Sequence, residues 1–319
     1  MDDSLRTQLD LAKQIRYVKL DFEIQFTESG ALPHYKSSAL RGGMGDMLME
    51  LFCVRDKACE ECDFEDICAY QRVMYPIYDI NPSFTSGKDR IGYLIDCEDL
   101  GEQALEGDRL NFSVTLFGKT IVEWRQVIQA FDKLGSVGLG EKRVRYKLLQ
   151  VKNSGSTILD EDRKIDRKNL KIQQVGAYVD SRKGIILENR LQFLTPAEIR
   201  FKGEAVQHFE PEAVMSALAR RIYMYSCFEG IQCREIKLPP EDLPLMVCEH
   251  SFRGWVKRYS SHTREAMTFN GIMGYADLEN ISDECREMIL MGELFRVGRN
   301  TKFGLGKIRL VEAGRREQR

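Results

Sequence analysis

Apolar and polar residues follow the same succession of patterns in the two halves of the chain. In the first half, the strict alternation of Arg16–Phe26 predicts a half-buried strand. Residues 123–135 place apolar side chains at positions i, i+3, i+4 and i+7, which predicts a helix that ends at a glycine. We expect a shorter helix at 44–52 and further strands at Arg109–Ile121 and 144–151.

The second half repeats this order. Arg190–Gly203 resembles a strand, and Pro211–Phe228 is a long helical stretch with proline near its start. Two strand patterns, at 252–261 and 269–279, precede a helix at Asp283–Gly298 and a last strand. The repeated order of strand, helix, further strands, helix, glycine loop and strand predicts an α+β protein. We expect two tandem ferredoxin-like (RRM-like) domains with a C-terminal glycine-rich loop.

A polar stretch separates the two patterns. Residues 152–175 carry mixed charges and few apolar positions, which is typical of a connection between domains. We therefore expect an N-terminal domain at 1–151 that carries a four-cysteine insertion, a polar connection at 152–188, and a C-terminal domain at 189–319. A hairpin is expected around Asp180–Gly184.

Charge is unevenly distributed along the 319 residues. The formal net charge of −2 gives no support for nucleic-acid binding by the chain as a whole. Residues 290–319, however, hold eight Arg or Lys against three Glu, and residues 133–147 are also basic. No run of 18 apolar residues and no cationic start followed by an apolar stretch occurs, so we expect a cytoplasmic protein without a membrane helix.

The two basic stretches coincide with two glycine-rich runs, KLGSVGLGEKRVRYKL and RVGRNTKFGLGKIRL. Neither run has the spacing of a nucleotide-binding phosphate loop or of the dinucleotide-binding GxGxxG pattern. Both follow a helix and precede a strand, which is the reverse of those folds. Glycine lets backbone amides approach a phosphate closely, but a helix cap followed by a tight turn needs no ligand at all.

Cys53, Cys59, Cys62 and Cys68 lie within 16 residues with the spacing C-x5-C-x2-C-x5-C. Four thiolates can complete a tetrahedral metal site, and disulfides are disfavoured in a reducing compartment. The spacing predicts structural zinc. An iron–sulfur cluster and unligated thiols are the alternatives.

Several runs occur in an order that is similar to one family. These runs are LPHYKSSALRGGMGDML, the cysteine cluster with CAYQRVMYP, FSVTLFGKTI, FDKLGSVGLG, LTPAEIRFKG, WVKRYSSH with NGIMGYADL, and VGRNTKFGLGKIRL. Together they resemble the CRISPR-associated endoribonucleases of the RAMP superfamily, which process precursor CRISPR RNA in antiviral defence. The resemblance spans nearly the whole chain, and it implies that the glycine-rich loop recurs because the domain recurs.

The resemblance also implies a reaction without a catalytic metal. A base removes a proton from a ribose 2′-hydroxyl, which attacks the adjacent phosphate and leaves 2′,3′-cyclic phosphate and 5′-hydroxyl ends. The catalytic candidates are His34, Tyr35, Lys36 and His262. The expected RNA-binding residues are Arg41, Arg143, Arg145, Lys257, Arg258, Arg296, Arg299, Lys302, Gly304, Gly306 and Lys307.

The chain departs from the family pattern at one position. Many relatives carry a histidine before Val-Gly-Lys ahead of the final loop, whereas this chain has Arg296, a poor base. Three hypotheses follow: an endoribonuclease, a non-cleaving RNA-binding subunit of a CRISPR effector complex, and a zinc-stabilised interaction protein without RNA. Repeat RNA and other CRISPR effector subunits are the expected partners.

Overall fold

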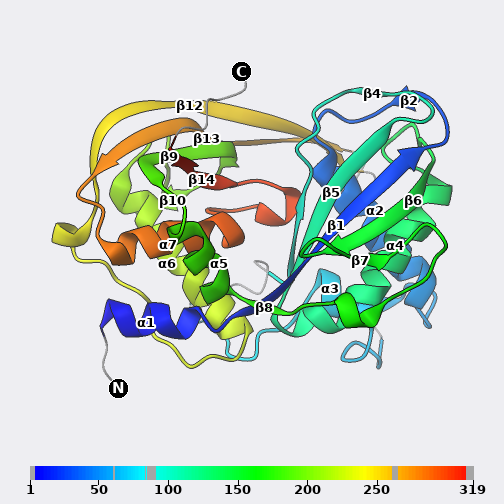
Figure 1. Cartoon of the computed structure of the whole chain (residues 1–319), viewed down its shortest axis with the longest axis horizontal. Coiled ribbons are helices and arrows are strands. Elements are labelled where there is room, and N and C mark those ends of the chain that lie inside the picture. The colour runs from blue at the N-terminus through cyan, green and yellow to red at the C-terminus, as the bar shows by residue number, and fades with distance from the viewer. Residues whose placement is uncertain (1–3, 60–61, 83, 85–90, 261–264, 314–319) are drawn as a thin grey trace.

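The described residues form two main antiparallel sheets, each covered by a pair of helices, and two small two-stranded sheets (Figure 1). The structure is a computed structural model and describes residues 4–59, 62–82, 84, 91–260 and 265–313. Apolar side chains form one core around each sheet. The core around the second sheet also includes Tyr17, Leu94 and Phe117 of the first sheet, so it extends across the junction between the two units.

The first sheet is built around a long central strand, which alternates buried and exposed residues as its sequence predicts. The strand order is β3-β5-β1-β6-β7, with β8 pairing with the start of β1. Helices α2 and α4 pack against each other and against the buried face of this sheet. The bounds are β1 (Arg16–Phe26), β3 (Tyr93–Asp96), β5 (Arg109–Phe117), β6 (Tyr146–Asn153), β7 (Ser156–Leu159), β8 (Gln173–Gln174), α2 (Lys36–Phe52) and α4 (Trp124–Val137).

The second sheet has the order β12-β13-β9-β14, and helices α6 and α7 cover it. Strands β12 and β13 form a long hairpin that arches over the top of the molecule toward the first unit (Figure 1). The bounds are β9 (Leu187–Ala197), β12 (Leu245–Ser260), β13 (Glu265–Glu279), β14 (Ile308–Glu312), α6 (Pro211–Phe228) and α7 (Asp283–Phe295).

Both sheets share one topology. In chain order, each unit runs strand, helix, two strands, helix, strand, and its four main strands are arranged 2-3-1-4. This is the ferredoxin-like arrangement, so the predicted α+β class with two tandem ferredoxin-like units is confirmed.

The smaller elements connect and frame these units. The N-terminal helix α1 packs on α6 and α7 of the second unit, although the strand that follows it opens the first. The smaller elements are α1 (Leu5–Ala12), β2 (Gly30–Ala31), α3 (Ala69–Met74), β4 (Gln103–Ala104), η2 (Gly118–Glu123), η3 (Arg167–Asn169), α5 (Val175–Lys183), β10 (Arg200–Phe201), β11 (Glu204–Ala205), η4 (Pro240–Asp242) and η5 (Thr301–Phe303).

The hairpin expected around Asp180–Gly184 is wrong, because helix α5 occupies this stretch. Val175 and Val179 are fully buried one turn apart, which a helix achieves and a tight hairpin does not. Arg182 is buried, and its guanidinium pairs with Glu293 of α7 and with Glu312 of β14. Tertiary contacts thus make a helix of a segment whose local composition is polar.

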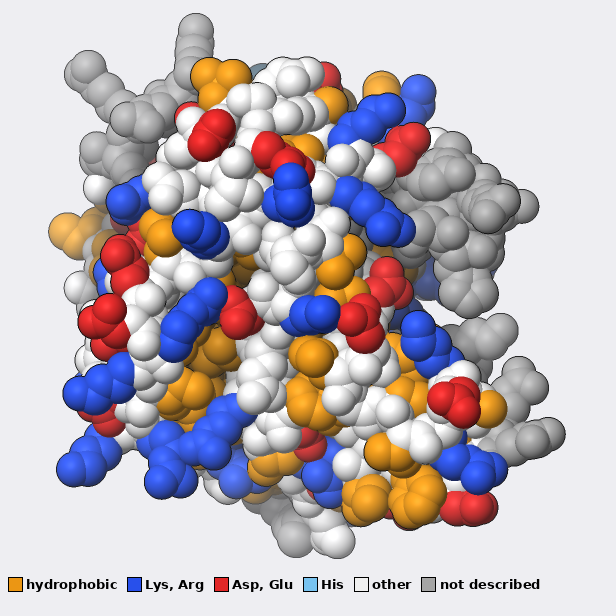
Figure 2. Space-filling view, turned by 90° about the vertical axis from the view of Figure 1, so that its right-hand side faces the viewer, with side chains coloured by type: hydrophobic (Ala, Val, Ile, Leu, Met, Phe, Trp, Pro, Cys, Tyr) orange, Lys and Arg blue, Asp and Glu red, His pale blue; other side chains and the backbone are white. Residues whose placement is uncertain are grey.

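Surface charge is mixed on the face formed by the first unit. Lys and Arg side chains are interspersed with Asp and Glu there, and basic side chains gather toward the lower left of the view (Figure 2). No helix within the described ranges is long and apolar enough to cross a membrane.

Candidate functional site

A cleft of about 490 Å³ lies where the two units meet and includes Tyr35; we call it the Tyr35 cleft. Its walls are the loop at 31–35, one face of α2, and the first glycine-rich loop. Lys257 reaches it from the β12–β13 hairpin of the second unit. Residues far apart in sequence, from both units, therefore line one cavity.

The first glycine-rich loop takes its shape from a helix cap. Gly138 caps α4 with a positive φ of 96°, and a side chain there would collide with the backbone of Arg143. The chain then reverses through the bridge between Leu139 and Val144. Glycine is required here by backbone geometry alone, and the turn presents Lys142 and Arg143 to the cleft.

Among the described catalytic candidates, Tyr35 is the one whose side chain lines the cleft. Burial raises the pKa of its phenol, although the nearby Arg296 guanidinium opposes this shift. Its hydroxyl bonds to Ser37 and to Thr195 of the second unit. Tyr35 therefore carries a neutral hydroxyl near neutral pH, which can donate a proton or a hydrogen bond but is a poor base.

The two neighbours of Tyr35 have opposite environments. The His34 side chain is 60% exposed, and its Nδ1 lies 3.4 Å from Glu102 Oε1. Lys36 is fully buried, and its ammonium donates to Asp99 and to the carbonyl oxygen of Gly101. Neither side chain is among those that line the cleft: His34 is exposed to solvent, whereas Lys36 anchors a loop.

The predicted cations of this region also separate into two groups. Arg143 and Lys257 line the Tyr35 cleft, are exposed, and have no carboxylate partner among the described residues. The guanidinium of Arg145, by contrast, donates from Nε and Nη2 to Oε2 of Glu28, and its backbone amide donates to Oε1. Arg143 and Lys257 therefore line the same cleft as Tyr35, whereas Arg145 is paired with Glu28 and does not line that cleft.

The second glycine-rich loop joins the two units. Arg296 is 3% exposed and donates to the carbonyl oxygens of Gly304 and Ile95, with Asp96 Oδ1 at 3.6 Å. Lys307 pairs with Asp96 at 2.7 Å and with Glu98 at 2.6 Å. The expectation that Arg296 contacts RNA does not fit this buried position.

Asp96 is the carboxylate at the centre of this junction. Burial alone would raise the pKa of Asp96, but Arg296 and Lys307 hold it below its ordinary value. Its charge is thus matched by two cations of the other unit, which stabilises the contact between the units.

The remaining glycine-loop residues have mixed positions. Arg41 donates to the Tyr93 hydroxyl and lies over the Phe303 ring, so it braces the loop from α2. Gly304 and Gly306 are buried by Tyr35, Ser37 and Val297, and they reach no solvent. Arg299 and Lys302 line a different and larger cleft. His262 lies outside the described residues, and of Arg258 only the backbone in β12 is described.

Sequence reasoning missed four residues of this region. Ser37 and Thr195 bond to Tyr35 across the junction, Lys142 lines the Tyr35 cleft, and Trp255 lies 60% exposed beneath Lys257. Lys142 had a usable signal, since it belongs to the same basic run as Arg143. The contact from Thr195 to Tyr35 joins positions 160 residues apart and leaves no trace in local pattern.

The four clustered cysteines lie in the loop between α2 and α3. Cys53 caps the end of α2, Cys68 caps the start of α3, and the other two lie between them. Burial, and then the neighbouring thiols, raise the pKa of Cys59. The amide of Lys57 donates to Cys53 Sγ at 3.2 Å, as amides often do to metal-bound sulfur.

No group of three or more His, Cys, Asp or Glu side chains, in the part of the chain that the structure describes, is already drawn together enough to hold a metal ion. The donor chemistry of the four thiols fits zinc, and their position at adjacent helix ends fits a staple. Metal binding by these residues therefore stays a prediction.

Two tandem ferredoxin-like units are the architecture that the RAMP resemblance implies, and the cleft at their junction is lined by Lys142, Arg143 and Lys257. Comparison with family models agrees with this class. Residues 191–308 match the model of the CRISPR-associated endoribonuclease Cas6, and residues 15–172 match a model described as an N-terminal domain. The predicted resemblance to CRISPR-associated endoribonucleases is thereby confirmed. No curated protein matches the chain.

Solved structures show the same fold at low sequence identity. A partial Cas6-RT-Cas1–Cas2 complex is similar over 96% of this chain and 47% of its own, with a TM-score of 0.55 and 12% identity. This chain thus spans about half the length of that one. A Thermus thermophilus Cas6 product complex is similar over 93% of this chain and 100% of its own, with a TM-score of 0.50 and 13% identity.

Proposed function

We propose that this protein is a metal-independent endoribonuclease that cleaves precursor CRISPR RNA within its repeats. The observation that carries the proposal is the composition of the Tyr35 cleft, which is lined by a neutral phenol and by Arg143 and Lys257, two cations without carboxylate partners among the described residues. The Cas6 match over residues 191–308 supports RNA as the substrate.

The reaction needs one group to take a proton and others to stabilise charge. His34, the exposed neighbour of Tyr35 in the chain, would take the proton of the ribose 2′-hydroxyl. The 2′-oxygen then bonds to phosphorus, the bond from phosphorus to the 5′-oxygen breaks, and that oxygen gains a proton. Tyr35 would donate to the phosphate, and Arg143 and Lys257 would balance its growing negative charge.

Glu102 has a supporting part in this scheme. Its carboxylate lies 3.4 Å from Nδ1 of His34, so it favours the tautomer in which Nδ1 carries the proton. Nε2 is then left to accept the proton of the 2′-hydroxyl. The products would be a 2′,3′-cyclic phosphate and a 5′-hydroxyl.

A second candidate function is an RNA-binding subunit that does not cleave. Two observations favour it: His34 is exposed instead of held inside the cleft, and Lys36, expected to assist, is buried in a loop contact. The same cations would bind RNA in either case.

Partners follow from the same proposal. Repeat RNA is the proposed ligand. Other CRISPR proteins are proposed partners, since one of the structures with a similar fold is a partial Cas6-RT-Cas1–Cas2 complex.

Incubation of the purified protein with the repeat RNA of its own locus in EDTA separates the two candidates. Cleavage in EDTA, slowed about 10²–10⁴-fold by His34→Ala, is the expected result. His208→Ala is the matched control, because His208 is also exposed and faces a glutamate, Glu249, at 3.8 Å. Tight binding without cleavage would overturn the nuclease proposal in favour of the non-cleaving subunit.

A further inference from the structure

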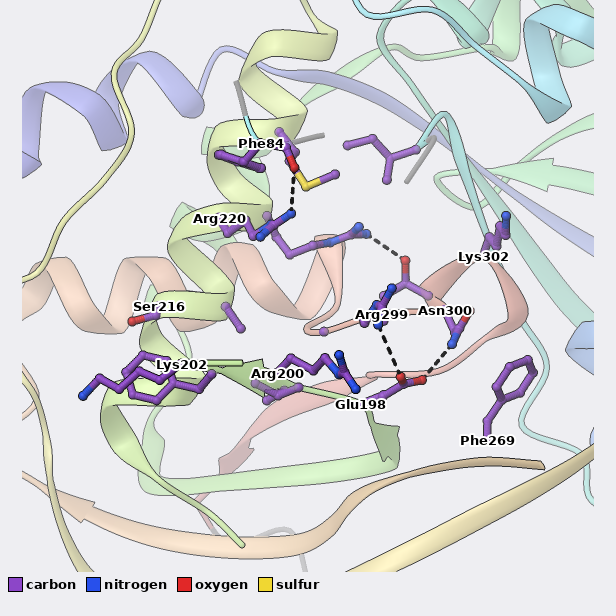
Figure 3. A pocket seen from close by; sticks show the side chains of 18 of the residues that line it. Phe84, Glu198, Arg200, Lys202, Ser216, Arg220, Phe269, Arg299, Asn300 and Lys302 are labelled. Atoms are coloured by element: carbon purple, nitrogen blue, oxygen red, sulfur yellow. Dashed lines mark hydrogen bonds and ion pairs between the residues drawn. The ribbon is translucent and has the colours of Figure 1, made fainter. Parts of the chain in front are cut away.

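A second and larger cleft, of about 900 Å³, lies beside helix α6 and does not include Tyr35; we call it the α6 cleft. It is lined by α6, the β10–β11 turn, the start of the second glycine-rich loop, and one face of β13 (Figure 3). Two of its lining residues, Arg299 and Lys302, were expected from the sequence to bind RNA, and none was a catalytic candidate. The side chains that line it indicate the chemical class of the ligand that it could bind.

Positive charge dominates this cleft. Six cations line it against the two carboxylates Glu198 and Glu235, namely Arg200, Lys202, Arg220, Arg221, Arg299 and Lys302. Glu198 is already engaged, since Arg299 and Asn300 both point toward it (Figure 3). Arg200 and Arg220 are exposed and have no carboxylate partner among the described residues. The cleft therefore suits a polyanion.

One buried hydrogen-bond donor in this cleft, a nitrogen of Arg221, has no partner among the described residues. Arg221 is 6% exposed, and one terminal nitrogen of its guanidinium bonds to the carbonyl oxygen of Phe295 and to the Thr301 hydroxyl. Its Nε is buried and has no hydrogen-bond partner within the described part of the chain. A buried donor of this kind is costly unless a ligand or water satisfies it.

Aromatic side chains alternate with these cations. Phe84 lies under the guanidinium of Arg220 at 4.2 Å, Phe201 lies under Lys202, and Phe269 stacks on Phe303 at 5.4 Å. Phe84, Phe201 and Phe269 are each partly exposed in the cleft. Cations beside accessible aromatic rings are the usual means of binding single-stranded nucleic acid, because every base offers a face for stacking.

The position of the β12–β13 hairpin relates this cleft to the Tyr35 cleft. On the β12–β13 hairpin, Lys257 lies opposite Thr268 and faces the Tyr35 cleft, whereas Phe269, the residue after Thr268 in β13, faces the α6 cleft. Neighbouring residues of a strand point to opposite sides. The two clefts therefore lie on opposite faces of one hairpin.

We propose that the α6 cleft binds a short unpaired segment of RNA, of one or two nucleotides within the cavity, separately from the strand in the Tyr35 cleft. The identity of the ligand as RNA rests on the proposed function. The volume lies within the range of about 300–1,000 Å³ that encloses ligands of nucleotide size. Duplex RNA is excluded by the chemistry, because its bases are stacked on one another and cannot stack on phenylalanines.

Fluorescence anisotropy with a labelled uridine octamer tests this site in the full chain. The double variant Arg200→Ala/Arg220→Ala should weaken binding of the octamer at least about tenfold and flatten its salt slope by about 1.4, at 0.7 for each lost phosphate contact. Phe269→Ala should weaken it at least about five-fold through lost stacking. Arg163→Ala/Arg167→Ala removes the same charge from exposed positions elsewhere and is the control.

Three results would overturn the inference. One is an octamer affinity that the Arg200→Ala/Arg220→Ala variant leaves unchanged. Another is an equal loss in the control variant, which would mean unspecific charge attraction. The third is tighter binding of an eight-base-pair duplex than of the octamer. Cleavage of repeat RNA, measured in parallel on the unmodified protein, tests the proposed function by itself, so failure of either proposal is recognised independently.

Discussion

The hydroxyl of Tyr35 occupies the space where a side chain at Gly304 would begin. A Cβ on Gly304 would lie 2.5 Å from that oxygen and 2.7 Å from Cβ of Ser37. Tyr35 belongs to the first unit and Gly304 to the glycine-rich loop of the second. The absence of a side chain at Gly304 therefore lets the Tyr35 hydroxyl pack directly against the loop of the second unit.

Gly304→Ala should weaken the contact between the two units and so lower the stability of the protein. The residue has a φ of 92° and a full contact with Tyr35, so we expect a loss of about 1–3 kcal/mol in the free energy of unfolding, measured with urea. Gly155→Ala is the control, because Gly155 has a φ of 80° with nothing within 4 Å of its Cβ. Equal losses in the two variants would mean that backbone strain alone, and not the Tyr35 contact, sets the effect.

Arg143→Ala should weaken binding of repeat RNA and flatten the salt dependence of binding by about 0.7–0.9, because one phosphate contact is lost. Arg163→Ala is a matched control: both arginines sit in turns with positive φ, but Arg163 pairs with Asp132 at 2.7 Å. A filter-binding series from low to high salt provides the slopes. An unchanged slope for Arg143→Ala would leave this loop as a helix cap with no ligand.

Asp96→Asn should lower stability at neutral pH by about 1–2 kcal/mol, since Arg296 is left buried without its counter-charge. The pKa of Asp96 is held below its ordinary value, so its contribution exists above about pH 4 and is lost as the pH falls through the lowered value. The stability difference between the unmodified protein and the variant should therefore shrink below pH 4. A difference that stays constant from pH 7 to pH 3 would contradict this role.

The cysteine cluster should bind about one zinc ion per chain, or iron with a visible chromophore, in protein purified without oxygen. Cys59→Ser with Cys62→Ser should abolish binding, whereas Cys248→Ser, which changes an isolated cysteine, should not. Elemental analysis measures this directly. Absence of both metals, together with rapid alkylation of all four thiols in the native state, would show that the thiols are unligated.

Local periodicity predicted the main elements of the fold. The bounds of β1 and α6 agree with the sequence pattern residue for residue, because each has one continuous buried face. Helix α5 was missed, since its stability comes from the contact of Arg182 with α7 and not from its own sequence.

The candidate site was predicted less completely. Tyr35, Arg143 and Lys257 were named from motifs and do line one cleft. Lys36 and Arg296 were named for the same reasons, but burial and contacts with the other segments give them structural positions. The sequence shows that a side chain is cationic. It does not show which carboxylates or carbonyl groups the folded chain places beside that cation, and these contacts decide whether the cation is available to a ligand.

The single-turnover rate at which Tyr35→Phe cleaves repeat RNA in EDTA tests most directly whether the active site lies in the Tyr35 cleft. Tyr178→Phe is the control, because Tyr178 is likewise buried with a raised pKa and a hydrogen-bonded hydroxyl, but lies on α5. We predict that Tyr35→Phe slows formation of the 2′,3′-cyclic product about 10²–10³-fold at saturating RNA, while Tyr178→Phe does not. A rate for Tyr35→Phe equal to that of the unmodified protein would contradict the placement of the active site in the Tyr35 cleft.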